Sequence, residues 1–389
     1  MPVAGRKPMK ICILQTIHEP YDKRVFHKEA KSLVAAGHEV ISIVPSDQPL
    51  PDSAEGVQFR RIPASKNFFD RFVSSLRLAW MGRRERADVY MSVEPESWVS
   101  TLLVKLMTGR KIVFDVHEYF PTLFARLFPK AMERAVVWMT LKAMRGMARM
   151  TDALILTKEC LRADFAGLPT PATVVLNTNH LQPPCTEIPE DIRTRYAHHT
   201  AIIHQGIFGD ARGSYQLLDA MKIVAQKIPD IKCICLGDYL YGDEAAYREA
   251  LRTSGMDRHI ELLPPVPFQQ VPAYIAASRI GLILFQPVGL QHTLGMPHKM
   301  FDYMREGVPV IAPDYAVEIR HVIEEAQCGL LIDVTDPKAI AEAIIRLIEN
   351  PEEARRLGAN GRRSVETRYN WETEEKKLLA VFENLRAKP

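Results

Sequence analysis

Residues 289–314 read GLQHTLGMPHKMFDYMREGVPVIAPD and combine a loop, a helical pattern and a β-branched run. Pro297 stands where the helix would begin, and Gly307 closes an eleven-residue pattern. Pro at the first helical position and Gly just past the last are the usual start and stop signals. The segment therefore predicts a loop, a helix over 297–307 and an extended run over 308–311.

The start of this predicted helix is a candidate anion-binding site. A helix N-terminus presents unpaired backbone N–H groups and a partial positive charge. Lys299 lies in the first turn, and Asp302 lies three residues further on the same face. A cation and a carboxylate at this spacing suit a diphosphate and a sugar diol respectively. The alternative interpretation is a surface loop followed by a solvated helix.

Length and composition leave room for two domains of a soluble protein. The chain has 389 residues, of which 47% are hydrophobic and 25% charged. The six cysteines show no metal-ligand spacing, which favours reduced thiols in a cytoplasmic protein. The first ten residues lack the apolar core of a signal peptide, and no apolar run is long enough to cross a bilayer.

Charge is unevenly distributed around the net value of +3. Residues 1–180 carry 26 Lys and Arg against 18 Asp and Glu, a net charge of +8, whereas the remainder carries 24 against 29, a net charge of −5. The basic half predicts an anionic partner, whether an acceptor, a membrane surface or nucleic acid.

Apolar runs alternate with amphipathic helical patterns in the first half. The predicted strands are Lys10–Gln15, Val40–Val44, Asp88–Val93, Lys111–Val116, Ala153–Thr157 and Thr173–Leu176, and the predicted helices are Lys23–Ala36 and Ser97–Met107. Strands separated by helices indicate βαβ units and a parallel sheet. The Pro-rich residues 178–200 interrupt the alternation and are interpreted as an interdomain linker.

The same alternation restarts after this linker. The predicted elements are strands Ala201–His204, Lys232–Leu236, Glu261–Leu263, Ile280–Phe285 and Leu330–Ile332, and helices Ser214–Lys227, Glu244–Ser254, Val271–Ser278 and Pro337–Glu349, with a helical region from 351 onward. We interpret the chain as two Rossmann-like domains in tandem, 1–180 and 181–371.

Several common chemistries lack their motifs. Neither half has G-x-G-x-x-G after its first strand, and no G-x-x-x-x-G-K-[ST] occurs. The chain has no Asp-x-Asp pair to hold a metal-bridged diphosphate, and His198 and His199 are interpreted as surface residues. If a diphosphate binds without metal, fixed cations and backbone N–H groups must hold it.

Two further candidates follow strands, where open α/β sheets bind ligands. Arg212 lies in the turn GIFGDARGSY (206–215) after the strand at 201–204, either as a phosphate ligand or as a solvated side chain. His117 follows the strand within FDVHEY (114–119), and Glu118 beside it either orients it or covers the loop.

Taken together, these motifs resemble the retaining glycosyltransferases of family 4. DKRVFHKEAKSLVAAGHEV (22–40), FDVHEYFP (114–121), GDARGSYQLLDAM (209–221), PHKMFDYMREGVPVIAPD (297–314), CGLLID (328–333) and RYNW (368–371) carry the resemblance. It implies the GT-B fold, an α/β architecture of two Rossmann-like domains facing each other across a deep cleft. The first would bind the acceptor and the second a nucleotide-diphosphate sugar, and the helix at 372–389 would pack back on the first.

The resemblance also implies roles for individual residues. Asp302 would hold the ribose hydroxyls, Arg212 and Lys299 the phosphates, and His117 would lie beside the anomeric carbon as the catalytic residue. The backbone of Gly295 and Met296 would cap the diphosphate. Gly237 is a further donor-binding candidate. Transfer would proceed with retention by same-face attack, without a protein nucleophile, a metal or a cofactor beyond the nucleotide sugar.

Two positions depart from the family pattern. Leu294 stands where the first acid of the E-x7-E motif is expected, and Ile207 replaces the usual Arg after Gly206. A branch of the family carries the Pro-x-Lys helix instead of the full acidic pair, and this chain resembles that branch. We therefore expect an active site in which either the diphosphate relies more on Arg212, Lys299 and the helix N-terminus, or the affinity for the donor is weak.

The acceptor side offers fewer signals. His18, Asp22 and Arg24 lie in the first βα loop, although Asp22 could equally cap the following helix. Residues 66–86 and 124–149 mix basic with large apolar side chains, which suits amphipathic helices on an anionic membrane. The alternative is two ordinary core-facing helices with basic outer faces.

The resulting hypothesis is a retaining, metal-independent hexosyl or related glycosyltransferase of cell-envelope or exopolysaccharide synthesis. It would use a glycan or lipid-linked acceptor, bind no nucleic acid and act in the cytoplasm, either free or at the inner face of the cell membrane. The alternatives are a nucleotide-sugar-binding protein without transfer activity and a GT-B-fold sugar-nucleotide 2-epimerase.

Overall fold

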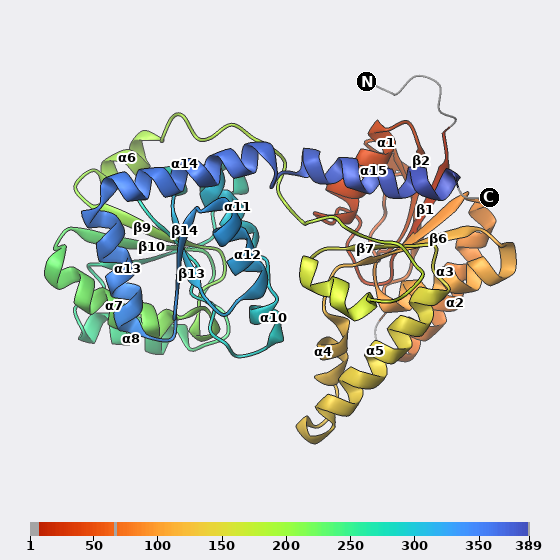
Figure 1. Ribbon diagram of the computed structural model, residues 1–389, viewed down its shortest axis with the longest axis horizontal. Helices are drawn as coiled ribbons and strands as arrows, with labels where there is room; N and C mark the ends of the chain where they lie inside the picture. Colours follow the sequence, from red (N-terminus) through yellow and green to blue (C-terminus); the bar gives the residue numbers. More distant parts are fainter. Residues whose placement is uncertain (1–7, 66–67, 388–389) are drawn as a thin grey trace. The chain divides into compact units, whose positions relative to one another are not determined.

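The computed structural model describes residues 8–65 and 68–387. The described chain divides into two compact α/β units (Figure 1). Unit 1 contains the chain up to Asn177 together with the segment from Trp371 onward, and unit 2 is Thr178–Asn370. Both units are built on sheets of parallel strands, as the alternating sequence pattern predicts.

Unit 1 contains an eight-stranded sheet in the order β3-β4-β2-β1-β5-β6-β7-β8. Every neighbouring pair is parallel except β3 and β4. The strands are β1 (Lys10–Leu14), β2 (Glu39–Pro45), β3 (Ser53–Ala54), β4 (Val57–Ile62), β5 (Val89–Ser92), β6 (Lys111–Val116), β7 (Ala153–Leu156) and β8 (Ala172–Val174). The order reverses direction at β1 and β5, and such a switch point favours ligand binding at the carboxyl ends of the strands.

The helical segments of unit 1 are η1 (Val25–Ala30), α1 (Lys31–Ala35), α2 (Phe68–Glu85), α3 (Pro95–Thr108), α4 (Phe120–Ala125), η2 (Lys130–Met132), α5 (Glu133–Arg149), η3 (Glu159–Phe165) and α15 (Trp371–Ala387). Local signals place α3: Glu94 and Ser97 form a capping box, Pro95 opens the helix, and Gly109 closes it in the left-handed conformation. The helix predicted over 23–36 begins instead as the π-helix η1, in which N–H groups bond five residues back.

Strand alternation builds a core on both faces of the unit 1 sheet. Ile11 and Ile13 of β1 join one buried cluster, whereas Cys12 and Leu14 join the other. Helix α15 covers the first face, where the indole N–H of Trp371 donates to Ser32 at 3.0 Å. The last helix of the chain therefore completes the core of the first unit.

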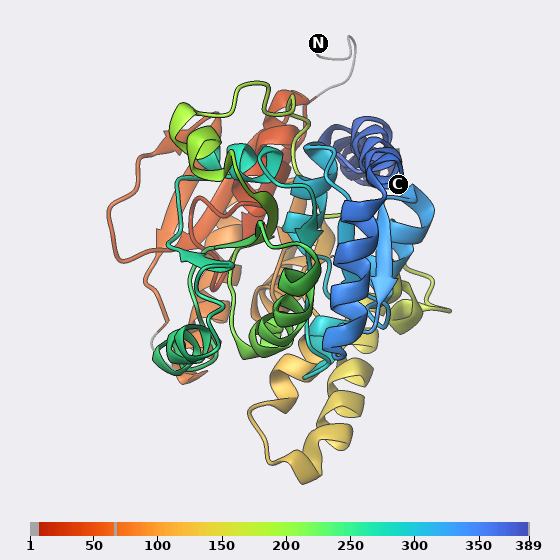
Figure 2. The ribbon, with the colours of Figure 1, turned by 90° about the vertical axis from the view of Figure 1, so that its left-hand side faces the viewer.

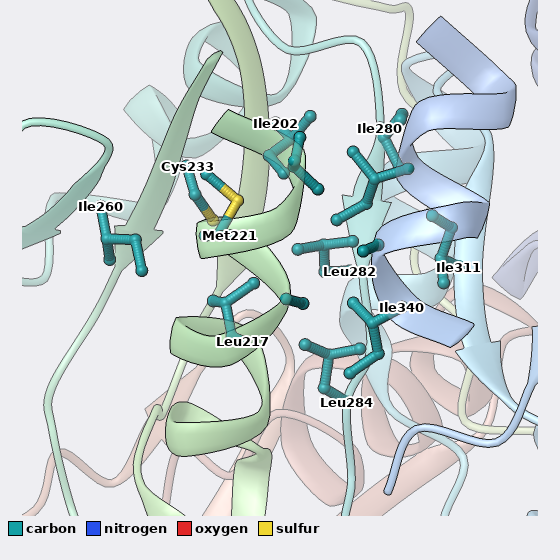
Figure 3. Close-up of a cluster of buried hydrophobic side chains, with 14 of the residues drawn as sticks. Ile202, Leu217, Met221, Cys233, Ile260, Ile280, Leu282, Leu284, Ile311 and Ile340 are labelled. Carbon is teal, nitrogen blue, oxygen red and sulfur yellow. The ribbon is translucent and has the colours of Figure 1, made fainter. Parts of the chain in front are cut away.

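Unit 2 contains a six-stranded parallel sheet in the order β11-β10-β9-β12-β13-β14. Its strands are β9 (Thr200–Gln205), β10 (Ile231–Leu236), β11 (Ile260–Leu263), β12 (Gly281–Leu282), β13 (Val310–Pro313) and β14 (Gly329–Ile332). Figure 3 shows apolar side chains of these strands meeting those of neighbouring helices, among them Leu217, Met221 and Ile340.

The helical segments of unit 2 are α6 (Glu190–Tyr196), η4 (Asp210–Arg212), α7 (Ser214–Lys227), α8 (Glu244–Thr253), η5 (Phe268–Gln270), α9 (Val271–Ala276), α10 (Leu290–Thr293), α11 (His298–Arg305), α12 (Val317–Ala326), α13 (Pro337–Glu349) and α14 (Pro351–Thr367). The segment 178–200, which the sequence predicts as an interdomain linker, contains α6 and the first residue of β9. The helix predicted over 297–307 is shorter in the structure, where it is α11. Pro297 lies before its first residue as the N-cap, in an extended conformation.

Candidate functional site

Lys299 lies in the first turn of α11, and its ammonium group lies at the end of β9. Lys299 Nζ is 3.1 Å from Nε2 of His204, a fully buried side chain whose Nε2 is also 3.1 Å from the carbonyl oxygen of Ile207. Burial, together with the nearby charge of Arg212, lowers the pKa of Lys299 to about 7. Burial and the charge of Lys299 likewise hold the pKa of His204 well below its ordinary value.

Arg212 supplies a second cation at this edge of the sheet, as the sequence predicts. The guanidinium lies 4.0 Å from the ring centroid of Phe285, and Lys299 Nζ lies 5.9 Å from the same centroid. Nearby Asp210 instead accepts hydrogen bonds from Tyr239 and Ser214. Among residues 8–65 and 68–387, neither cation forms an ion pair with a carboxylate. Two cations share this edge, and the neutral imidazole supplies no compensating negative charge.

The glycines at this edge have distinct structural roles. A Cβ on Gly206, which has φ +87°, would lie 3.7 Å from Nζ of Lys299, so the missing side chain leaves room beside the ammonium. A Cβ on Gly237 would lie 2.5 Å from the carbonyl oxygen of Gly206, so Gly237 permits close approach of the β9 and β10 ends. Gly237 also lines a cavity of about 190 Å³ together with Leu263 and Pro264.

Asp302 is held within a buried polar network. Its Oδ1 accepts a hydrogen bond from the amide of Asn179 at 2.8 Å and lies 3.7 Å from Nη1 of Arg305. The carbonyl oxygen of the same Asn179 amide lies 3.0 Å from His298 Nδ1. Asp302 is only 2% exposed, so its predicted contact with ribose requires access past these partners. Asn179 was missed because it follows the strands in a Pro-rich segment without periodicity.

The remaining donor-side candidates lie just ahead of Lys299. Gly295 and Met296 are half-buried in the short loop between α10 and α11, and Leu294 is the C-cap of α10. Their backbone therefore leads directly into the N-terminus of α11, where the sequence predicts a cap on the diphosphate.

A second cluster forms in unit 1 at the carboxyl ends of β1, β5 and β6. Nδ1 of His18 lies 2.6 Å from Oε1 of Glu94, and Nε2 of His117 hydrogen-bonds to the carboxylate of Asp115. Burial lowers the pKa of His18, but the hydrogen bond and charge of Glu94 outweigh it, so the pKa ends above its ordinary value. Glu94 and Asp115 were missed by the sequence analysis, although Glu94 precedes Pro95 at a recognisable helix start.

The other two predicted acceptor residues, Asp22 and Arg24, form hydrogen bonds within unit 1. Oδ1 of Asp22 accepts the backbone N–H groups of Arg24 and Val25, both at 2.8 Å, which agrees with the capping alternative. Arg24 is 4% exposed, and its guanidinium donates to Asp115 and to the carbonyl oxygen of Val175. Arg24 thus lies beneath the surface of the site and holds Asp115.

The π-helix η1 brings a second carboxyl group to this buried cluster. Arg24 and Glu29 are five residues apart, and Oε1 of Glu29 lies 2.9 Å from Nη2 of Arg24. Burial raises the pKa of Glu29 well above its ordinary value despite that contact, which favours a neutral carboxyl group. Arg24 and His117 instead hold the pKa of Asp115 low against its burial. Glu29, Asp115 and His117 could together offer metal ligands within 4.8 Å of one another, but Arg24 already supplies a cation there.

Two family matches account for most of the chain. Residues 23–179 match the family described as glycosyl transferase 4-like domain, and residues 200–350 match glycosyl transferases group 1. The first match covers most of unit 1, and the second lies in unit 2. With its two parallel α/β units, the chain belongs to the glycosyltransferases of the GT-B type.

Individual relatives are distant. Spore coat protein SA of Bacillus subtilis is 27% identical over 204 residues, which are 51% of this chain and 52% of that protein. A phosphatidyl-myo-inositol mannosyltransferase of Mycobacterium leprae is 27% identical over 174 residues, which are 45% of this chain and 43% of that protein. The matches span about half the length of these relatives. Anabaena HepE, in complex with UDP, covers 97% of this chain and 100% of its own with a TM-score of 0.71 and 15% identity, which shows the fold.

Proposed function

We propose that the protein is a retaining, metal-independent glycosyltransferase that moves a sugar from a nucleotide-diphosphate sugar to a glycan or lipid-linked acceptor. The observation that carries the proposal is the pair of cations at the end of β9, Lys299 and Arg212, neither of which has a carboxylate partner among the described residues. The UDP complex of HepE and the mannosyltransferase relative support a donor of this class.

A diphosphate would relieve the electrostatic cost of this arrangement. Burying a charge without a partner is unfavourable, and two neighbouring cations add mutual repulsion. The diphosphate would accept hydrogen bonds from both side chains and from the N-terminal N–H groups of α11. Because protein cations would neutralise the leaving diphosphate, no metal ion is needed for that task.

Calorimetric titration with UDP, GDP, ADP and dTDP tests the donor site and identifies the base. We expect one of these nucleotides to bind the wild-type chain and to bind Lys299→Met and Arg212→Met at least tenfold more weakly. The matched control is Lys222→Met, because Lys222 is exposed and paired with Asp219. Unchanged affinity in both site variants would refute the assignment, and turnover that requires Mg²⁺ would refute metal independence.

Two alternative functions can be distinguished by what happens to the nucleotide sugar. A nucleotide-sugar-binding protein without transfer activity would bind donor without consuming it, and a 2-epimerase would change the sugar of the donor. Leu294 at the position of the expected acid removes one place for an acid–base carboxylate, which disfavours the epimerase. Proton NMR of the anomeric signals separates transfer, epimerisation and simple binding, and also reports retention.

We further propose that unit 1 contacts an anionic membrane through residues 120–149. Figures 1 and 2 show α4 and α5 extending from the sheet of unit 1. Residues 120–149 expose the apolar side chains of Leu127, Phe128, Met132, Trp138 and Met139 and the basic side chains of Arg126, Lys130, Arg134, Lys142 and Arg149. This combination suits a surface that buries apolar groups beside anionic headgroups.

Vesicle flotation tests this contact. We expect the wild-type chain to float with vesicles containing phosphatidylglycerol and to stay behind with neutral vesicles. Trp138→Ser combined with Leu127→Ser should abolish flotation, whereas Leu240→Ser, an exposed apolar residue of unit 2, should not. No described helix of the chain is long and apolar enough to cross a membrane. The other basic segment, 66–86, includes residues 66 and 67, which lie outside the described residues.

A further inference from the structure

Two histidines meet at the carboxyl edge of the unit 1 sheet, and each is held by a buried carboxylate. The ring centroids of His18 and His117 lie 5.2 Å apart with the rings at 82°. Each ring uses one nitrogen on its carboxylate, Nδ1 of His18 on Glu94 and Nε2 of His117 on Asp115. Nε2 of His18 and Nδ1 of His117 form no hydrogen bond with the part of the chain that the structure describes.

Glu94 is unusually well fixed for a carboxylate of a loop. It is 2% exposed and accepts the backbone N–H groups of Thr16 at 3.1 Å, Ile17 at 3.1 Å and His18 at 3.2 Å. The hydroxyl of Ser97 donates to its second oxygen at 2.8 Å. These donors hold the carboxylate in place. Glu94 therefore fixes both the backbone conformation of the first βα loop and the orientation of the His18 ring.

The charges around His18 favour its protonated form. The carboxyl groups that raise its pKa are Glu94, in direct contact, and Asp22 and Asp115 at longer range. The ring of His117 packs edge-on against it and fixes its plane. The side chain of His18 is 26% exposed, so a charged N–H group remains accessible at the edge of the sheet.

We propose that His18 is an oxyanion-binding residue, which donates a charged hydrogen bond from Nε2 to a phosphate-type oxygen, and that Glu94 is its positioning residue. Glu94 already accepts the backbone N–H groups of Thr16, Ile17 and His18, so the imidazolium takes their place as the anion donor. The phosphate belongs either to the nucleotide donor or to an anionic acceptor, and in this respect the inference rests on the proposed function.

NMR of the full-length chain labelled with ¹³C-histidine tests this proposal. The signal of His18 is assigned by its loss in His18→Asn, and inorganic phosphate and UDP are the two probes. We expect at least one probe to shift the signal and to raise the pKa of His18 further, because a bound anion favours the charged ring. A His18 signal that neither probe moves would overturn the proposal.

The variant Glu94→Gln separates positioning from simple folding. Without the carboxylate, burial remains and the pKa of His18 should fall below its wild-type value, with the response to the probes lost. The control is His27→Asn, because His27 is exposed on the same segment. If Glu94→Gln does not fold, His18→Asn, which leaves the Glu94 backbone contacts in place, should still weaken phosphate or UDP binding, and unchanged binding would contradict the proposal.

The two probes distinguish the two sources of the phosphate. A response of His18 to UDP but not to inorganic phosphate assigns the oxygen to a nucleotide, and a response to inorganic phosphate as strong as that to UDP assigns it to an anionic acceptor. Either result supports the role of His18. Failure of the donor site itself would show separately, as equal UDP affinity of the wild-type chain and Lys299→Met.

Discussion

At the scale of single residues, Lys299 links protonation to the proposed binding of a donor. Its ammonium is buried beside the neutral imidazole of His204 and near the charge of Arg212, and its pKa is about 7 instead of 10.5. The sequence could place Lys299 in the first turn of a helix. It could not show His204, because a polar residue within an apolar strand is usually a satisfied part of the core.

Donor binding should therefore weaken as pH rises above about 7. A bound diphosphate raises the pKa of Lys299, so binding takes up a proton when the free ammonium is partly neutral. We expect up to about a tenfold loss of affinity per pH unit above pH 7. Calorimetry of a nucleotide sugar in two buffers of different ionisation enthalpy measures this uptake, and Lys299→Arg, which stays charged, should remove it. Affinity that does not change between pH 7 and 9 would contradict this coupling.

Because the charged side chain of Lys299 is buried, it should lower the free energy of unfolding. Because the folded pKa lies below the unfolded value, the folded state binds fewer protons between pH 7 and about 10, and this residue's contribution to stability rises with pH in that window. At pH 6, Lys299→Met should stabilise the chain by on the order of 1 kcal/mol. Denaturant unfolding of unit 2 measures the change, and Lys222→Met should stay within about 0.5 kcal/mol of the wild type. A large loss of stability in Lys299→Met would contradict the interpretation that the buried charge of Lys299 destabilises the folded state.

At the scale of elements, the sequence predicted strands and helices well where periodicity was strong and failed where tertiary contacts decide. Strand β4 was missed because its sequence, VQFRRI, alternates in burial but carries two arginines. The π-helix η1 and the shortened α11 depend on hydrogen bonds that no periodicity reports. In the candidate site, Arg212 and His117 could be predicted from their place after strands, and Lys299 from its place in the first turn of a helix. Glu94 and Asn179 instead act through contacts distant in sequence. Glu29 reaches Arg24 through the π-helix, which no periodicity reports.

Helix α14 fixes the end of the helix that carries Lys299. A Cβ on Gly358 would lie 1.9 Å from the carbonyl oxygen of Gly307, just past α11. Gly358→Ala should therefore displace this end and cost about 1–3 kcal/mol of stability, with weaker nucleotide binding. Thermal unfolding compares it with Gly146→Ala in α5, where a Cβ meets nothing within 4 Å and helix propensity favours Ala. Equal effects of the two substitutions would exclude this packing role.

At the scale of the whole molecule, the chain folds as two units with separate cores, and α15 returns to the first of them. Sequence alternation indicated two parallel α/β domains. It could not show that Trp371 is 1% exposed in the unit 1 core, because this follows from a contact with Ser32 more than three hundred residues earlier.

Scanning calorimetry should resolve these units, and Trp371→Ala should lower only the transition of unit 1. Removing this buried indole costs about 3–5 kcal/mol by loss of burial and creation of a cavity. Trp138→Ala, at a side chain that is 61% exposed, should change neither transition appreciably. A single transition that both substitutions leave unchanged would contradict the separate core of unit 1.

Scanning calorimetry with the best-binding nucleotide diphosphate tests the central claim most directly, once Trp371→Ala has identified the transition of unit 1. A ligand that binds only the folded state raises the transition of the unit that holds it. The donor assignment predicts that the nucleotide raises the unit 2 transition of the wild-type chain and of Lys222→Met, but not that of Lys299→Met. Stabilisation of Lys299→Met equal to that of the wild-type chain, or of unit 1 alone, would contradict it.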